Sequence, residues 1–200
     1  MSSTTAEIPK DIHAALKQGN KHHLGRIAIL TTDDTQDEEF FYPYYRFFEK
    51  GFDVDVLTPD GGALKCKNGA GLNDTKALNS ATQGDYEMLY IPGGNAPSKL
   101  KKNDEAVKWL RDFCLSAKPV AAICHGAQLL AEAGVIKGRN IAAWPECQKE
   151  IEKAGGIFAN RSSVRDGQFI TARWPGDLPA FMIAVMKELE FKGEVRKLVA

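Results

Sequence analysis

The sequence has no excess of charge of either sign, because its 26 basic side chains balance its 26 acidic ones and the formal net charge is zero. Binding to nucleic acid or to an anionic membrane surface depends largely on positive charge, and no basic patch stands out along the chain. We therefore expect no nucleic-acid partner and no membrane partner. A small molecule, a peptide or another protein chain is the expected partner.

Long apolar runs are also missing. The best run, residues 180–186, is too short to cross a bilayer and belongs to an amphipathic helix. The first 24 residues lack the apolar stretch of a secretory signal. We interpret residues 1–24 as a polar N-terminal extension and residues 25–200 as one domain, and we expect a cytoplasmic location.

Cysteine is scarce, and its spacing excludes two common uses. The four cysteines, at positions 66, 114, 124 and 147, form no CxxC pair and have no histidine at metal-ligand spacing. Neither a zinc site nor a disulfide framework is predicted, and reduced thiols are expected. Cys66, Cys114 and Cys147 are interpreted as structural.

The remaining composition is that of a globular α/β domain, with 44% hydrophobic residues and only 9 prolines and 18 glycines. Short apolar runs predict strands at 26–31, 52–57, 88–91 and 119–123, and helical periodicity appears between the first two and at 105–116, 127–133, 148–154 and 178–189. Continuous apolar strands that alternate with helices are typical of a mostly parallel sheet covered on both faces. The predicted fold class is a three-layer α/β sandwich.

The segment PVAAICHGAQLLAEAG has the pattern of a nucleophile elbow, in which a strand turns sharply into a helix between small residues. Such a turn presents Cys124 at the carboxyl edge of the sheet, and the following helix N-terminus favours a thiolate with a lowered pKa. The alternative is that Cys124 fills a small buried space. His125 is a candidate general base, although adjacent residues on a turn diverge and its ring would then serve another contact.

The acidic segment 33–39 follows the first predicted strand. Thr35 and Glu38 have the spacing of a capping box, which explains most of this acidity by a helix start. Glu39 is a candidate partner for a thiol at neighbouring strand ends, but the pattern alone favours a solvated side chain. Pro43 predicts that the helix is kinked or begins late.

The segment IPGGNAP follows a predicted buried strand, and its glycine pair permits close approach of the backbone to a ligand. The N–H groups of Gly94 and His125 are candidates for an oxyanion hole. A plain turn between a strand and a helix is the simpler interpretation of the same residues.

Taken together, these segments resemble the ThiJ/PfpI superfamily, and most closely its PfpI-like intracellular cysteine peptidase and deglycase branch. The resemblance runs from Arg26 to about Leu189, and the motifs that carry it are EFFYPYYR, IPGGNAP, AAICHGAQLLAEAGVIKGR, EIEKAGG and ITARWPGDLPAF. It implies a flavodoxin-like sandwich related to class I glutamine amidotransferases, with Cys124 as nucleophile and Glu39 as its carboxyl partner. It also implies a role for His125 beside the nucleophile, and backbone oxyanion contacts from Gly94 and His125.

The resemblance further implies a homodimer or a higher homo-oligomer, in which the peptidase branch completes its site across a subunit interface. That branch carries a glutamate just after the glycine turn, where this chain has Ser98, so peptidase activity is expected to be weak or absent. Some deglycase-like and glyoxalase-like members carry a histidine where this chain has Trp144. Trp144, with Tyr42 and Trp174, is a candidate wall of an apolar pocket, and a core or interface position is the alternative.

The expected function is that of a cysteine-dependent hydrolase of PfpI type, acting on an amide or carbonyl centre without a metal ion or organic cofactor. Cys124, His125 and Glu39 are the expected catalytic residues, and Gly94 and Trp144 the expected oxyanion and substrate contacts. One alternative is a glyoxalase-like lyase. Another is a non-enzymatic oxidative-stress sensor or chaperone that uses oxidation of Cys124.

Overall fold

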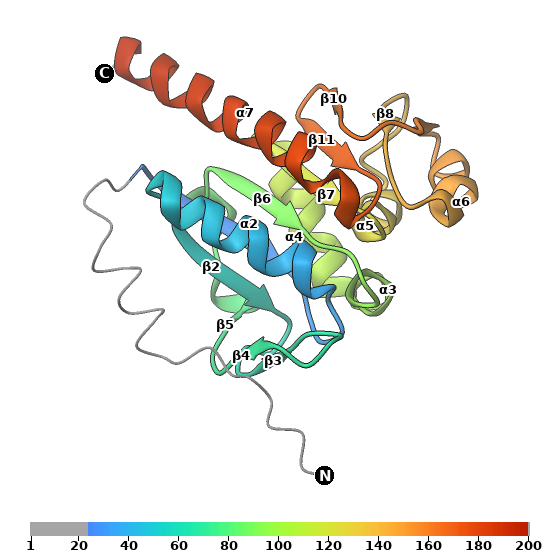
Figure 1. Cartoon of the computed structure of the whole chain (residues 1–200), viewed down its shortest axis with the longest axis horizontal. Helices are drawn as coiled ribbons and strands as arrows, with labels where there is room; N and C mark the ends of the chain where they lie inside the picture. Colours follow the sequence, from blue (N-terminus) through green and yellow to red (C-terminus); the bar gives the residue numbers. More distant parts are fainter. Residues whose placement is uncertain (1–23, 200) are drawn as a thin grey trace.

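The computed structural model describes residues 24–199, with side chains described as far as Glu190. Residues 1–23 of the expected extension lie outside the described residues. A seven-stranded sheet forms the centre, in the order β10-β11-β7-β6-β1-β2-β5, and only β10 is antiparallel to its neighbour (Figure 1). The strands are β1 (Arg26–Leu30), β2 (Asp53–Thr58), β5 (Lys76–Ala77), β6 (Met88–Ile91), β7 (Val120–Ile123), β10 (Val164–Asp166) and β11 (Phe169–Ala172). Two short ladders lie outside this sheet, β3 (Leu64–Lys65) with β4 (Gly71–Leu72) and β8 (Asn140–Ile141) with β9 (Ile157–Phe158).

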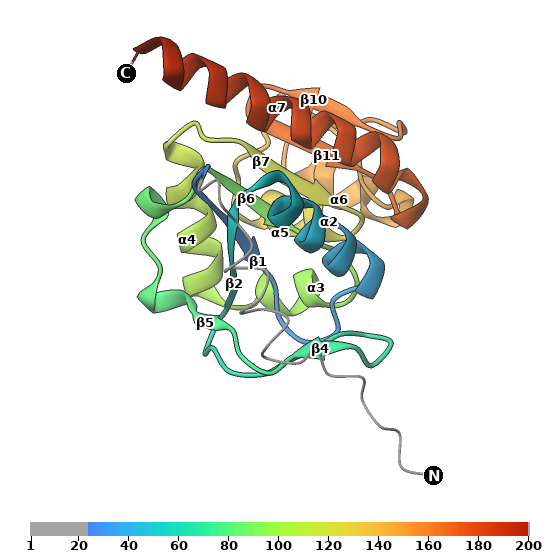
Figure 2. The same ribbon diagram turned by 60° about the vertical axis from the view of Figure 1, so that its left-hand side comes forward.

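Helices cover both faces of the sheet. They are α2 (Asp37–Lys50), α3 (Ala96–Leu100), α4 (Asp104–Leu115), α5 (Gly126–Glu132), α6 (Gln148–Lys153) and α7 (Leu178–Val199). Helices α2 and α7 lie on one face, and α4 and α5 lie on the other, as the rotated view makes clear (Figure 2). The predicted three-layer α/β architecture is therefore confirmed. Within the described chain, no helix combines the length and the apolar character needed to cross a membrane.

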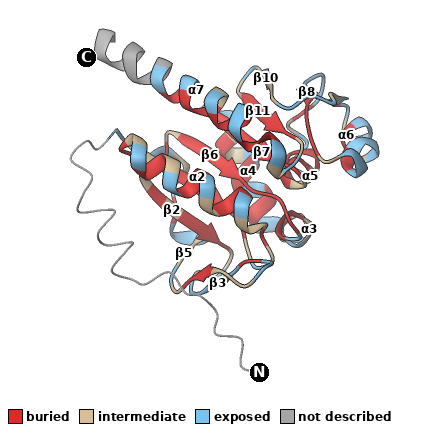
Figure 3. Ribbon diagram, viewed as in Figure 1, coloured by how far each residue is buried: buried red, intermediate tan, exposed pale blue. Residues whose placement is uncertain are grey.

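The two faces of the sheet have separate hydrophobic clusters, and the strands between them are buried on both sides (Figure 3). Alternate residues of β1 divide between the clusters: Ile27 and Ile29 pack toward α2 and α7, whereas Ala28 and Leu30 pack toward α4. Burial on both faces explains why the central strands are continuously apolar rather than alternating.

All four predicted strands are present, with ends shifted by one residue at most. Strand β11 was not predicted. Its sequence, FITA, includes a threonine that is fully buried, and the Thr171 hydroxyl oxygen accepts a hydrogen bond from the Ala142 N–H at 2.9 Å. The burial of this threonine requires a hydrogen-bond partner that lies far away in the sequence, so the local pattern does not predict a buried strand here.

Helix α2 differs from its prediction at both of the positions considered. It begins at Asp37, well before Pro43, so a late start is wrong. The capping box is also wrong, because the residue before the helix is Gln36 and it makes no side-chain capping bond. The Thr35 hydroxyl instead donates to the Gly93 carbonyl at 3.3 Å, and Thr35 pairs with Gly94 as an isolated β-bridge. These contacts join the loop after β1 to the loop after β6 and bring the start of α2 to the end of the sheet.

Candidate active site

Three of the sequence-predicted site residues, Cys124, Gly94 and Glu39, follow adjacent parallel strands of the central sheet, whereas Trp144 follows β8 outside it. Cys124 follows β7, the glycine pair follows β6, and Glu39 lies in the first turn of α2 after β1. The chain order reverses between β1 and β6, since β2 lies on one side of β1 and β6 on the other. Such a switch point is where open α/β sheets bind ligands.

Cys124 occupies a sharp turn between β7 and α5, as the elbow pattern predicts, with a left-handed φ of 60°. Its N–H donates to the Ala172 carbonyl at 3.0 Å, and its own carbonyl accepts from the Trp144 N–H at 3.3 Å. A Cβ at Gly126 would lie 2.6 Å from the Ile91 carbonyl oxygen, which explains the small residue there. The turn leaves 7% of Cys124 exposed.

The His125 ring lies beside the thiol rather than away from it. Its Nδ1 is 3.2 Å from Cys124 Sγ, so the expected divergence of these adjacent side chains is wrong. Burial lowers the pKa of His125 below its usual value, although the nearby Glu146 carboxylate acts in the opposite direction. A neutral imidazole next to the sulfur can accept the thiol proton.

Glu39 is fully buried, so the solvated interpretation is wrong. Its Oε2 accepts a hydrogen bond from the Gly93 N–H at 2.8 Å, and the carboxyl also interacts with the Cys124 thiol. Burial raises the pKa of Glu39 to about 7. Within residues 24–190, Oε1 is buried without a hydrogen-bonding nitrogen or oxygen, so a proton on this carboxyl would sit on Oε1.

The glycine pair is more than a plain turn. A Cβ at Gly93 would lie 2.5 Å from Glu39 Oε2 and 2.7 Å from Cys124 Cβ. A Cβ at Gly94, where φ is +77°, would lie 2.5 Å from the Asp34 carbonyl oxygen. Both positions therefore require glycine. The glycine pair as a whole was expected to allow close approach of the backbone, but only Gly94 was given a site role, and the contacts of Gly93 with Glu39 and Cys124 were not predicted.

The pKa of the Cys124 thiol is raised above its ordinary value, not lowered as expected. Burial is the main cause, and the neighbouring Glu39 carboxylate is the second. The backbone N–H groups of His125 and Gly94 face the sulfur and act in the opposite direction. Because Glu39 and Cys124 interact closely, they titrate as a pair, and formation of the thiolate requires a nearby proton acceptor.

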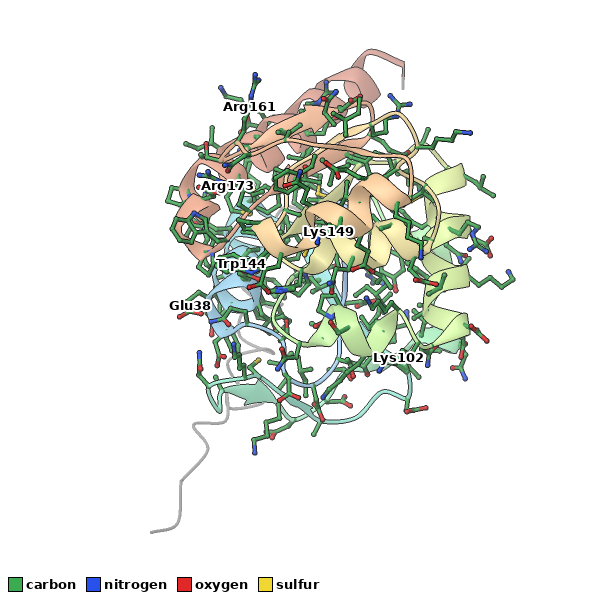
Figure 4. All side chains as sticks on the ribbon, turned by 90° about the vertical axis from the view of Figure 1, so that its right-hand side faces the viewer. Glu38, Lys102, Trp144, Lys149, Arg161 and Arg173 are labelled. Atoms are coloured by element: carbon green, nitrogen blue, oxygen red, sulfur yellow. The ribbon has the colours of Figure 1, made fainter. Side chains whose placement is uncertain are left out.

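A row of aromatic rings continues from the histidine, in which the first pair is stacked and the second is tilted. The ring centroids of His125 and Trp144 lie 6.2 Å apart at an interplanar angle of 30°, and those of Trp144 and Trp174 lie 6.2 Å apart at 39°. The structure thus brings two of the three expected wall residues together. Tyr42 lies on the exposed side of α2 and pairs with neither tryptophan ring. Trp144 and Arg173 lie toward the same margin of the molecule in Figure 4.

The three cysteines expected to be structural share the raised pKa of Cys124, so Cys124 differs from them by its position at the elbow beside His125 and not by its pKa. Burial raises the pKa of Cys66, Cys114 and Cys147 to about 12. The Ser98 hydroxyl donates to Gln128 Oε1 at 3.1 Å. Ser98 is therefore committed to α5 and does not provide His125 with an acidic partner.

Comparison with known proteins gives consistent matches. Residues 25–188 match the model of the DJ-1/PfpI family. The chain is 38% identical to Protein/nucleic acid deglycase 2 of Escherichia coli, over 78% of this chain and 92% of that protein. It is 33% identical to Deglycase PfpI of Pyrococcus furiosus, over 82% of this chain and 99% of that protein.

A solved structure from Anabaena variabilis, a two-domain protein with DJ-1/ThiJ/PfpI-like and ferritin-like domains, superposes with a TM-score of 0.80 at 31% identity. The match covers 83% of this chain and 48% of that one, so the present chain corresponds to about half of the two-domain protein. The elbow, the sheet order and these matches lead to one conclusion: the chain belongs to the DJ-1/PfpI family.

Proposed function

We propose that this chain is a cysteine-dependent deglycase, a hydrolase that removes carbonyl-derived adducts from amino groups. The observation that carries the proposal is the 3.2 Å contact between Cys124 Sγ and His125 Nδ1, next to a fully buried Glu39. Covalent catalysis requires a nucleophile within reach of a base, and Glu39 contacts this nucleophile rather than the base.

The proposed first step moves the thiol proton to His125 Nδ1 while the sulfur attacks the substrate carbonyl carbon. A C–S bond forms, the C=O π electrons move to oxygen, and that oxygen then takes a proton. The His125 and Gly94 N–H groups that face the sulfur would stabilise the oxyanion as charge leaves the sulfur. Glu39 Oε1 is the proposed site of a second mobile proton, because Oε2 is engaged with Gly93. The C–N bond of the adduct then breaks and the amine leaves with a proton, and a proton shift from the sulfur-bearing carbon to its neighbour converts the adduct into a thioester without any external oxidant. One water molecule hydrolyses the C–S bond of this thioester, which releases the hydroxy acid and restores the thiol.

Two observations favour adduct removal over peptide hydrolysis. Ser98 is bonded to Gln128 and stands where the peptidase branch carries its acid, so the triad that this branch uses for peptide hydrolysis is not expected here. In addition, relatives at 33% and 38% identity carry the name deglycase. We propose a small-molecule or peptide adduct as the substrate class.

The test is release of free amine and hydroxy acid from an amino acid treated with a small dicarbonyl, followed by NMR. We expect turnover by the parent, and losses of about 100-fold or more for Cys124→Ala and His125→Ala. Cys114→Ala is the matched control, because that thiol is only partly buried and lies on α4. Turnover that survives Cys124→Ala would overturn the proposal, as would equal turnover of an unmodified peptide.

The same protein variants can distinguish an enzymatic function from that of an oxidation sensor. Mild peroxide followed by peptide mapping would report whether Cys124 is oxidised selectively. Selective, stable oxidation of Cys124 in a protein that turns over no carbonyl substrate would overturn the enzyme proposal in favour of an oxidation sensor. A homodimer or higher homo-oligomer remains our proposal for the assembly, to be checked by analytical ultracentrifugation.

A further inference from the structure

The loop after β1 and the glycine loop after β6 form a short antiparallel bridge beside the elbow. Thr35 faces Gly94 in this bridge, and the residues on either side of the pair make the two ladder hydrogen bonds, at 3.3 Å and 2.9 Å. The two residues of such a non-hydrogen-bonded pair direct their own N–H and C=O groups away from the opposite chain. The Gly94 N–H therefore points away from Thr35, and it reaches the Cys124 sulfur on the other side.

The Gly94 N–H shares one planar peptide group with the Gly93 carbonyl, and the two point in opposite directions across it. The contacts that hold the carbonyl therefore also set the direction of the N–H. The Gly93 carbonyl accepts one hydrogen bond from the Thr35 hydroxyl and one from the Gln36 N–H, each at 3.3 Å. Donors at the carbonyl oxygen also polarise the peptide group, which makes its N–H a stronger donor.

This peptide group needs a support from outside its own loop. It joins two glycines, whose backbones rotate more freely than those of other residues. Neither can be replaced by a stiffer residue, because an added Cβ would lie 2.7 Å from Cys124 Cβ at Gly93 and 2.5 Å from a backbone oxygen at Gly94. Thr35 can serve as the support because it is fully buried and its own carbonyl accepts the Lys67 N–H at 2.9 Å.

We propose that Thr35 is a positioning residue of the candidate active site, whose hydroxyl holds the Gly93–Gly94 peptide group so that the Gly94 N–H points at the sulfur and at the oxyanion formed beside it. Thr35 acts through the glycine pair and not on the substrate. The Gly94 N–H is one of the two oxyanion donors of the proposed deglycase, so the role of Thr35 in turnover rests on that function, whereas its effect on the thiol does not.

Labelling of Cys124 by iodoacetamide at pH 8, quantified by peptide mapping, tests the effect on the thiol. An N–H that donates to the sulfur stabilises the thiolate, so we expect Thr35→Val, which lacks the hydroxyl, to slow labelling about 5-fold. Thr35→Ser keeps the hydroxyl and should label at nearly the parent rate. The matched control is Thr58→Val, because Thr58 is also buried and its hydroxyl accepts the Gly61 N–H at 3.1 Å at the end of β2. Faster labelling in Thr35→Val would indicate a loosened turn and would overturn the proposal.

The kinetic test measures kcat and KM for the adduct of an amino acid with a small dicarbonyl. We expect Thr35→Val to lower kcat about 10-fold and to leave KM nearly unchanged, because an oxyanion donor acts mainly in the transition state. Thr35→Ser should recover most of kcat. Thr35→Ala also lacks the hydroxyl and gives the same comparison if the valine variant does not fold.

Two results would overturn the positioning role. One is parent-like labelling or a parent-like kcat in the variants without the hydroxyl. The other is an equal loss in Thr35→Ser and Thr35→Val, which would assign the effect to packing of the methyl group. Absence of turnover in the parent, together with the expected labelling rates, would overturn the deglycase and leave the positioning of the Gly94 N–H standing.

Discussion

Gly93 packs against both the Glu39 carboxyl and the Cys124 side chain. Because glycine has no side chain, these two groups can lie close together at this position. Gly93→Ala would place a methyl group 2.5 Å from Glu39 Oε2 and 2.7 Å from Cys124 Cβ. Because both neighbours are buried, we expect the free energy of unfolding to fall by about 1–3 kcal/mol, measured by urea denaturation. Gly84→Ala is the control, since the nearest atom to its Cβ would be 4.0 Å away. A Gly93→Ala protein as stable as the parent would contradict this account of the turn.

The buried Glu39 makes stability depend on pH. Its pKa is about 7 in the folded protein and near the ordinary 4.5 in the unfolded chain, so the folded state holds the proton more tightly. Its contribution is therefore fully present below about pH 4.5 and is lost as the pH rises through 7. We expect Glu39→Gln, which cannot ionise, to match the parent near pH 4.5 and to exceed it by up to about 3 kcal/mol at pH 8.

The measurement is urea denaturation at both pH values. Glu49→Gln, on the exposed side of the same helix, is the matched control for the loss of one carboxylate. A Glu39→Gln protein that shows the same pH dependence as the parent would mean that Glu39 does not carry this proton.

At the scale of an element, helix α2 tolerates a proline in its interior because a strand supplies the missing donor. Pro43 has no N–H for the carbonyl of Glu39, four residues earlier. That carbonyl accepts a hydrogen bond from the Tyr90 hydroxyl at 2.6 Å, and Tyr90 is fully buried in β6. The same contact fixes the turn of α2 that carries the Glu39 carboxyl.

This contact predicts a coupling between two residues. Tyr90→Phe leaves the buried Glu39 carbonyl without a donor, and we expect it to cost about 1–3 kcal/mol of stability. Pro43→Ala restores an N–H at the helix position, so the cost of Tyr90→Phe should shrink by about 1 kcal/mol in that background. A double-mutant cycle of unfolding free energies measures the difference. Additive effects would show that the hydroxyl does not replace the helix bond.

Features specified by a few consecutive residues could be predicted from the sequence, and features that depend on contacts between distant residues could not. The elbow at Cys124 and the central strands were predictable because a few consecutive residues specify them. The burial of Glu39 and the position of Thr35 were not, because both depend on contacts with Gly93, more than 50 residues away. Strand β11 was not predicted for the same reason, because its buried Thr171 depends on a hydrogen bond with Ala142. Local geometry was therefore predicted, and the polar contacts between loops were not.

At the scale of the whole molecule, one sheet separates two hydrophobic clusters, and each contains at least one buried cysteine outside the candidate site. Cys66 belongs to the cluster under α2 and α7, and Cys147 belongs to the cluster under α4 and α5. Because both clusters share the same strands, we expect them to unfold together as one domain. Pulse labelling of the two thiols across a urea series should give the same midpoint for both. Earlier labelling of either thiol would instead divide the chain into two unfolding units.

The left-handed backbone at Cys124 has a consequence for how this chain changes under selection. A side chain at φ 60° is strained, and glycine is the residue that relieves such strain. Selection for folding alone would therefore favour loss of the thiol at this position. Directed evolution that rewards only heat resistance would tend to produce inactive variants here, so thermostable versions of this protein need a screen in which the thiol must react.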